Sequence, residues 1–354
     1  MNPTLKVIQP GLQTTVQDLG RIGGQRFGIP VSGATDAVAL RVANVVVGNA
    51  QGTAGLEIAL MGPTLEVVAD SVRVAVAGGT AEIEVTALDG TIRRIPALQS
   101  VRLMRGERLR VGAIPGSAVA YLAVAGGLDL EPFQGSLSTY VRGAFGGLEG
   151  RALREGDLLP LRRRQAEERG EMRLAVFDLV PQSHVRVVLG PQDDYFTAAA
   201  IQTFLSQPYT VTREADRMGL RLDGPVLTHA KGYNIVSDGI APGAIQVPGN
   251  GLPIILLADR QSTGGYPKIA TVASVDLAAL GRASPGLKLT FEAISVEVAQ
   301  QLRREQGQRL AALAGQLEPA RTTAFDLARL LSENLVSGVV DAQDLGSDSL
   351  PKHR

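Results

Sequence analysis

Residues 64–125 are divided into short segments in which apolar and polar residues alternate. These segments are 64–68, 72–77, 81–86, 101–104, 108–111 and 118–124. Alternation with a period of two is typical of strands that bury one face. The pairs Gly78-Gly79, Asp89-Gly90 and Pro115-Gly116 between the segments favour tight turns. Strands that recur about every 8–12 residues indicate an all-β barrel or sandwich, so the pattern predicts a mainly β protein.

Glycine content and chain length extend this prediction to the whole chain. Glycine accounts for 41 of the 354 residues, about 12% where roughly 7% is usual. The length suggests about two domains, and a mixed charge run at 162–173 is typical of a linker. We therefore expect two β-barrel-like subdomains at 1–170 and 171–354. Further strands are expected at 185–189, 209–213, 244–247, 254–258, 269–274 and 287–292.

Only a few segments favour helices. Asp36 is typical of a helix N-cap, and Gly48 would end that helix after Val47. Three more helices are expected. One begins at Asp193-Asp194 and carries Phe196, Ala200 and Phe204 on one face, and the other two lie at 295–313 and 322–335. Residues 9–34 are rich in glycine and glutamine and are expected to form a loop.

Composition and missing motifs exclude several classes of protein. The 35 basic and 35 acidic residues cancel, which argues against nucleic acid and against an anionic membrane surface as partners. There is no cysteine and no tryptophan, and three histidines argue against a dedicated metal centre. No apolar run approaches the ~18 residues of a membrane span, and no signal peptide is visible, so we expect a cytoplasmic protein. P-loop, dinucleotide-binding, nucleophile-elbow and Met-Lys-Met biotinylation motifs are also missing.

The segment 243–268 carries the densest set of polar side chains. An apolar strand runs directly into Asp259, Arg260 and Gln261, and glycines precede Tyr266 and Lys268. Such a segment places charged and amide groups at a strand end, where glycine allows a ligand to approach the backbone. A purely structural turn with an Asp–Arg pair is the alternative. Lys268 stands out because lysine supplies only five of the 35 basic residues.

At these residues the chain resembles a known family. The matching segments include 11–21, 28–36, 48–49, 56–57, 62–63, 125–127, 135–139, 150–151, 156–157, 216–222, 243–251 and 259–268. In this order they resemble the biotin-dependent carboxyltransferase family of KipA, allophanate hydrolase subunit 2 and the 5-oxoprolinase subunit designated C. They are also similar to half of the carboxyltransferase region of urea carboxylase. Two positions depart from the family pattern, since Leu137 stands where arginine is frequent and Leu252 where glutamine is frequent.

The resemblance implies cyclophilin-like barrels, one of them in the C-terminal half. It also implies a KipI-like subunit as a separate chain, and it leaves room for a third 5-oxoprolinase subunit. One implied function is an ATP-dependent 5-oxoprolinase, with ATP and Mg²⁺ shared with the partner subunits. A second is carboxyl transfer to urea or a related amide from carboxybiotin on a separate carrier. A third is a non-catalytic antagonist that binds a KipI-like kinase inhibitor.

For an amide or lactam substrate we expect the following roles. Lys268, Arg260 and Arg217 would stabilise negative charge. Asp259 or Asp36 would act as a base or bind the metal ion, although the sequence predicts no dedicated metal site. Asn44, Gln246 and Gln261 would orient the amide, and Tyr266 would donate a hydrogen bond or pack.

Several of these residues also have a structural interpretation. Asp36 would then serve as an N-cap alone, and Asn44 as a buried hydrogen-bonding residue. Asp216 and Arg217 would form an ion pair with each other.

Overall fold

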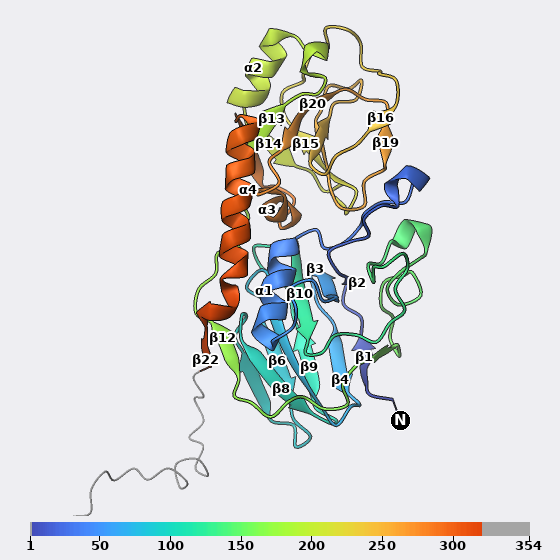
Figure 1. Ribbon diagram of the computed structural model, residues 1–354, viewed down its shortest axis with the longest axis vertical. Coiled ribbons are helices and arrows are strands. Elements are labelled where there is room, and N and C mark those ends of the chain that lie inside the picture. The colour runs from blue at the N-terminus through green and yellow to red at the C-terminus, as the bar shows by residue number, and fades with distance from the viewer. Residues whose placement is uncertain (1, 321–354) are drawn as a thin grey trace, which may run out of the picture. The chain divides into compact units, whose positions relative to one another are not determined.

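Strands dominate the part of the chain that the computed structural model describes, residues 2–320 (Figure 1). Residues 4–160, here called the two-sheet half, form two antiparallel sheets. One has the order β11-β1-β4-β9-β6-β7 and the other β2-β3-β10-β5-β8. Their strands are β1 Thr4–Gln9, β2 Gln13–Gln17, β3 Gly55–Ala59, β4 Thr64–Val67, β5 Ser71–Ala77, β6 Ile83–Thr86, β7 Ile92–Ile95, β8 Ser100–Met104, β9 Arg108–Val111, β10 Val119–Val124 and β11 Leu158–Pro160.

The two sheets share one apolar core. Leu5 and Leu65 of the first sheet pack with Leu56, Ile58 and Val74 of the second, and all five are at most 1% exposed. This packing follows from the alternation in the sequence, because every second side chain of each strand faces the partner sheet. The predicted strands of residues 64–125 are therefore confirmed.

Helix α1 (Ala37–Val47) covers the outer face of the second sheet. The Asp36 carboxylate accepts hydrogen bonds from the backbone N–H groups of Val38 and Ala39, at 3.0 and 2.9 Å. Gly48 ends the helix in the left-handed conformation, with φ of 81°, which glycine adopts without strain. The predicted helix and both of its caps are confirmed.

Residues 184–293 form a closed barrel, here called the barrel, with the strand order β13-β20-β17-β18-β15-β14-β21. Only the pair β13 and β21 is parallel. The elements are β13 His184–Leu189, α2 Ala198–Ser206, β14 Tyr209–Val211, β15 Gly219–Asp223, β17 Ala244–Gln246, β18 Ile254–Leu256, β20 Lys268–Val272, α3 Leu277–Gly281 and β21 Lys288–Ala293. A separate two-stranded ribbon pairs β16 (Asp238–Gly239) with β19 (Thr263–Gly264). The predicted barrel of the C-terminal half is thus confirmed.

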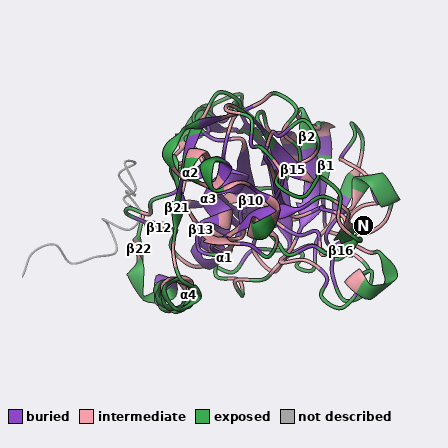
Figure 2. Ribbon diagram, turned by 90° about the horizontal axis from the view of Figure 1, so that it is seen from above, coloured by how far each residue is buried: buried purple, intermediate pink, exposed green. Residues whose placement is uncertain are grey.

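Helix α4 (Val296–Ala311) follows the barrel and begins at the N-cap Ser295. Figure 1 shows α4 running beside both the barrel and the two-sheet half, and most of its surface is exposed in Figure 2. The remaining elements are β12 Met172–Leu174, β22 Leu317–Pro319 and the 3₁₀ turns η1 Gln25–Phe27, η2 Val141–Gly143, η3 Asp193–Tyr195 and η4 Leu313–Gln316. The predicted helix 295–313 is confirmed as α4. The helix expected after Asp193-Asp194 is confirmed as α2, although those two residues form the turn η3 and the helix begins later, at Ala198. The helix expected at 322–335 lies outside the described residues. Among residues 2–320, no helix is long and apolar enough to cross a membrane.

The loop expected at 9–34 is partly wrong, because Gln13–Gln17 forms β2 and pairs with β3. Thr14, Thr15 and Val16 are β-branched and favour a strand, but glycines on both sides concealed that signal. Sequence alternation also missed β3, which is buried along most of its length. The subdomain boundary at 170/171 and the cyclophilin-like character of the barrel stay predictions.

The two halves meet through backbone as well as side chains. The Ser32 N–H donates to the Ala258 carbonyl at 3.1 Å, and the Ala118 N–H donates to the Arg282 carbonyl at 2.9 Å. A Cβ atom on Gly281 would lie 2.3 Å from the Thr35 carbonyl oxygen, so no other residue fits there without displacing the chain. This close contact positions the residues of the candidate site.

Candidate functional site

Two cavities adjoin where the barrel meets the two-sheet half. The barrel cavity, of 670 Å³, is lined mainly by β15, β17, β18 and the loops that follow them. The junction cavity, of 380 Å³, is lined by residues of both halves. Both volumes suit a small ligand. Arg142, Asp216 and Met218 line both cavities and therefore form their common wall.

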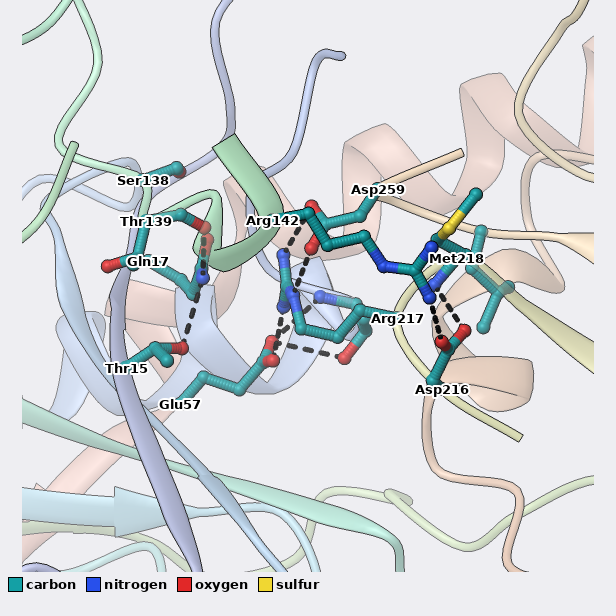
Figure 3. Close-up of polar contacts among 12 residues, drawn as sticks. Thr15, Gln17, Glu57, Ser138, Thr139, Arg142, Asp216, Arg217, Met218 and Asp259 are labelled. Atoms are coloured by element: carbon teal, nitrogen blue, oxygen red, sulfur yellow. Dashed lines mark hydrogen bonds and ion pairs between the residues drawn. The ribbon is translucent and has the colours of Figure 1, made fainter. Parts of the chain in front are cut away.

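The floor of the junction cavity is an ion-paired cluster centred on Arg217 (Figure 3). Arg217 donates to both carboxylate oxygens of Asp259, at 2.8 and 3.1 Å, and to the Gly33 carbonyl at 2.7 Å. A further hydrogen bond joins its guanidinium to Glu57 of β3. Burial alone would lower the pKa of Arg217, but the carboxylates of Glu57 and Asp259 hold it above the usual value. The guanidinium therefore stays charged and ties β3 to the loop after β18.

Besides Arg217, Glu57 bonds to Thr35, which lies just before α1, and to Tyr121 of β10. One of its oxygens accepts from the backbone N–H and hydroxyl of Thr35, at 2.9 and 3.0 Å, and from the hydroxyl of Tyr121. Tyr121 is fully buried in β10, and its hydroxyl also accepts from the Asp36 N–H at 2.8 Å. Burial, followed by the charge of Glu57, raises the pKa of Tyr121 well above its usual value. Tyr121 thus acts as a neutral donor that fixes Glu57.

Glu57, Tyr121 and Thr35 were missed as site residues. In the sequence, Glu57 belongs only to one of the segments that match the family. The feature that could have indicated its role is a carboxylate within the otherwise apolar segment Gly55–Ala59. A charged residue is almost never fully buried unless it is paired. That rule alone would have indicated a buried basic partner from elsewhere in the chain.

Asp36 lies beneath this cluster and does not line either cavity. Besides capping α1, its carboxylate accepts from Arg282 at 2.6 Å, and its side chain is fully buried. Burial raises the pKa of Asp36, although Arg282 opposes the shift. The structure therefore supports the N-cap interpretation and adds an ion pair between the two halves.

The predicted pair between Asp216 and Arg217 does not form. Arg217 points to Glu57 and Asp259, whereas Asp216 pairs with Arg142 at 2.9 Å. The Asp259–Arg260 pair does not form either, because Asp259 pairs with Arg217 instead. Arg260 donates instead to the carbonyls of Ile240 and Leu257, at 3.1 and 3.2 Å, and burial lowers its pKa.

Gln246, Gln261 and Tyr266 line the barrel cavity. The Gln261 amide donates to the Gln246 oxygen, and the Gln246 amide donates to the Tyr266 carbonyl, both at 3.4 Å. These distances lie at the long end of hydrogen bonding. The half-buried Gln261 amide can therefore turn toward a ligand at little cost, whereas Gln246 is only 2% exposed and closely packed. The three predicted amide-orienting or packing residues are thus brought together around one cavity.

Lys268 and Asn44 do not line either cavity. The ammonium of Lys268 is buried and donates to Asp238 of β16 at 3.0 Å. That hydrogen bond lowers the pKa of Asp238. The side chain of Asn44 bonds to the Thr53 carbonyl at 2.7 Å and to Asn49 at 2.9 Å. Asn44 therefore joins the end of α1 to the following loop, which fits its structural interpretation.

The described residues offer little to a metal ion. Within residues 2–320 no group of three or more His, Cys, Asp or Glu side chains is placed to hold one. Glu57 and Asp259, the two acids on the cavity floor, already share the guanidinium of Arg217. The site residues therefore do not fit a bound Mg²⁺ ion.

Fold and site together define a two-part β protein with a charged cavity at the junction of its parts. Residues 27–293 match the family described as the carboxyltransferase domain, subdomains A and B. The chain belongs to this family.

Known relatives fall into two kinds. The chain is 37% identical to an Escherichia coli protein, the 5-oxoprolinase subunit designated C, over 317 residues, which cover 88% of this chain and 98% of the relative. It is 32% identical to the urea amidolyase of Saccharomyces cerevisiae, covering 88% of this chain but 18% of that much longer protein. The solved structure of the Kluyveromyces lactis urea amidolyase is 30% identical with a TM-score of 0.80, and the match covers 93% of this chain and 21% of that chain.

Proposed function

We propose that this protein is a subunit of an ATP-dependent 5-oxoprolinase and acts with a separate KipI-like subunit to open the lactam of 5-oxoproline to glutamate. The observation that carries the proposal is the end-to-end match with the Escherichia coli 5-oxoprolinase subunit, which covers 98% of that relative. The matches with the urea amidolyases cover only 18% and 21% of those proteins. The extent of the match therefore favours the 5-oxoprolinase subunit.

The junction cavity supports the proposal because its chemistry suits a small lactam. Ala59, Leu60, Val119 and Leu257 give it an apolar wall for the ring methylenes. Asp259 accepts from Arg217 alone among the described residues, so its remaining lone pairs are open to a lactam N–H. Thr15, which also lines the cavity, carries a hydroxyl that can donate to the lactam carbonyl.

The reaction adds water across a lactam C–N bond that is stable on its own. Transfer of the γ-phosphoryl group of ATP to the lactam oxygen would release ADP and make the carbonyl carbon electrophilic. Water would then attack this carbon, the C–N bond would break with the nitrogen taking up a proton, and hydrolysis of the phosphorylated oxygen would release phosphate. In this proposal the partner subunits hold ATP and Mg²⁺. This chain would bind and orient the ring between Asp259 and Thr15. The rigid pairing of Asp259 with Arg217 preserves that geometry without reorganisation during the reaction.

The test is 5-oxoproline-dependent ATP hydrolysis by the chain reconstituted with its KipI-like and third subunits. We expect the Asp259→Asn variant to lose roughly 10²-fold or more in kcat/KM, as expected when a positioned group is lost. The matched control is Asp70→Asn, which changes an exposed aspartate in the two-sheet half. Failure of 5-oxoproline to stimulate ATP hydrolysis with all subunits present would rule the proposal out.

Carboxyl transfer from carboxybiotin on a separate carrier is the second candidate. The family match and the similarity to urea amidolyase favour it. The same cavity would then take urea or a related amide, and Asp259 would accept its N–H. Activity that requires a biotinylated carrier and disappears with avidin would establish this reaction in place of lactam opening.

The third candidate, a non-catalytic antagonist of a KipI-like inhibitor, predicts a different mutational pattern. Asp259→Asn, a change in the junction cavity, would leave its function intact, because binding would depend on the surface and not on the cavities. Loss of ATP hydrolysis in cavity variants that still bind the partner would argue against this role.

A further inference from the structure

The common wall of the two cavities contains an ion pair between the two halves. Arg142 belongs to η2 of the two-sheet half, whereas Asp216 precedes β15 of the barrel. Their side chains approach to 2.9 Å and are 60% and 49% exposed (Figure 3). Ion pairs this exposed are weak, so a competing anion can replace one partner.

The two members of this pair differ in mobility. One oxygen of Asp216 accepts from the backbone N–H groups of Met218 and Gly219, at 2.8 and 3.1 Å, and the other accepts from Arg142. The aspartate is therefore fixed by its own turn. Arg142 is held by a single hydrogen bond, and its guanidinium makes no other bond among residues 2–320. Arg142 is thus the member that can move.

The remaining charges decide where a ligand's carboxylate can lie. Glu57 and Asp259 at the cavity floor would repel an anion. Arg217 cannot attract one strongly, because four of the five N–H groups of its guanidinium already bond to Glu57, Asp259 and Gly33. Among the residues that line the cavity, cationic capacity remains only at Arg142 and Arg213. An anionic group must therefore bind beside these two arginines.

We infer that the junction cavity takes small amides that carry a carboxylate, and that Arg142 recognises this carboxylate after exchanging it for Asp216. The lactam end faces Asp259 and the carboxylate faces Arg142. Asp216 acts as a positioning residue that keeps Arg142 at the wall while the cavity is empty. The substrate itself rests on the proposed function, whereas the exchange makes predictions of its own.

The test uses the reconstituted assembly and compares two lactams. The KM is measured for the substrate 5-oxoproline, and the inhibition constant for its analogue 2-pyrrolidinone, the same lactam without the carboxylate. Arg142→Gln removes the cation, so we expect the substrate KM to rise roughly 10- to 100-fold, the effect of one charged hydrogen bond. The inhibition constant of the analogue should not change. Arg142→Lys should restore part of the affinity, because it keeps the charge without the planar fork.

Asp216→Asn should change the KM for 5-oxoproline in the opposite direction. Asparagine keeps an oxygen for the N–H groups of Met218 and Gly219 but no longer holds Arg142 as an ion pair. The substrate KM should then fall by roughly two- to fivefold, the value of an exposed ion pair. Arg108→Gln, which breaks a comparably exposed pair with Glu66 within the two-sheet half, serves as the control and should change neither constant.

The outcomes separate this inference from the proposed function. Equal shifts for the substrate and its analogue in Arg142→Gln, or a raised substrate KM in Asp216→Asn, overturn the exchange while lactam opening stands. A wild-type assembly without 5-oxoproline-dependent ATP hydrolysis overturns both.

Discussion

The two cavities use polar residues in opposite ways. At the junction cavity, Glu57, Arg217 and Asp259 are all nearly buried and joined by ion pairs. Around the barrel cavity, Gln246 and Gln261 are neutral and bond to each other at 3.4 Å. The first arrangement holds charged groups in fixed positions, and the second offers neutral amides, of which Gln261 is half-buried and can turn toward a ligand.

This difference determines whether a substitution changes ligand binding alone or also changes the stability of the fold. A buried charge must keep its partner, because an uncompensated charge in a low dielectric is costly. Substitutions of Glu57, Arg217 or Asp259 should therefore affect folding and binding together. Removal of a half-buried amide whose hydrogen bond is 3.4 Å long costs little stability, so substitution of Gln261 should affect binding alone.

The largest effect is expected from Arg217→Leu. It leaves Glu57 and Asp259 buried without a cation, and the loss of one partner of a buried pair costs about 3–5 kcal/mol. Urea unfolding should show this loss in the free energy of unfolding. Arg108→Gln breaks an exposed pair and should cost at most about 1 kcal/mol. If both variants lost a similar free energy of unfolding, the buried ion pairs would be no more important for stability than the exposed one.

A smaller effect is expected from Tyr121→Phe. The change removes the donor to Glu57 and the acceptor of the Asp36 N–H, and an unsatisfied buried group costs about 1–3 kcal/mol. Tyr266→Phe is the matched change at the barrel cavity, where the side chain is 41% exposed. It should lie within about 0.5 kcal/mol of wild type. Thermal unfolding of the two variants side by side compares the cavities directly, and equal melting temperatures would refute the difference.

Gln261→Ala tests the adaptable side of the comparison. It deletes a half-buried amide whose hydrogen bond is 3.4 Å long, so the free energy of unfolding should change by less than about 0.5 kcal/mol. If a ligand occupies the barrel cavity, its affinity should still fall. A clear loss of stability would show that these amides are structural.

The smallest effect is a change in titration at the ribbon beside the barrel. The hydrogen bond from Lys268 lowers the pKa of Asp238 in the folded protein. Any stability it contributes is therefore present above the unfolded pKa of about 3.9 and lost as the pH falls through the lower, folded value. In Lys268→Met the pKa of Asp238 should rise toward its ordinary value, as followed by NMR of the carboxyl carbon. An unchanged titration would show that Lys268 does not act on Asp238.

Local features of the fold were predictable from the sequence. Asp36 and Gly48 bracket α1 because capping depends on residues within one turn of the helix ends. Strands β4, β6 and β9 were visible because buried and less buried positions alternate along each of them. Strand β3 was missed because its only alternation, Leu56-Glu57-Ile58, is shorter than the four or more residues that indicate a strand.

The partners within the site were harder to predict. The sequence indicates Arg217 as a site residue and suggests the neighbouring Asp216 as its partner, whereas the structure pairs it with Glu57, 160 positions away. Asp36 was similarly recognised as a cap, while its pairing with Arg282 spans 246 positions. Such pairs depend on how the barrel docks on the two-sheet half, and a single sequence carries no local signal of that docking.

The contact between Gly281 and Thr35 has a mechanical consequence. Since a Cβ atom at residue 281 would come within 2.3 Å of the Thr35 oxygen, backbone rests on backbone with no side chain between. Thr35 and Gly281 both line the junction cavity. The two halves cannot move closer together at this point without a clash between their backbones, so this contact sets a lower limit on the width of the cavity beside it.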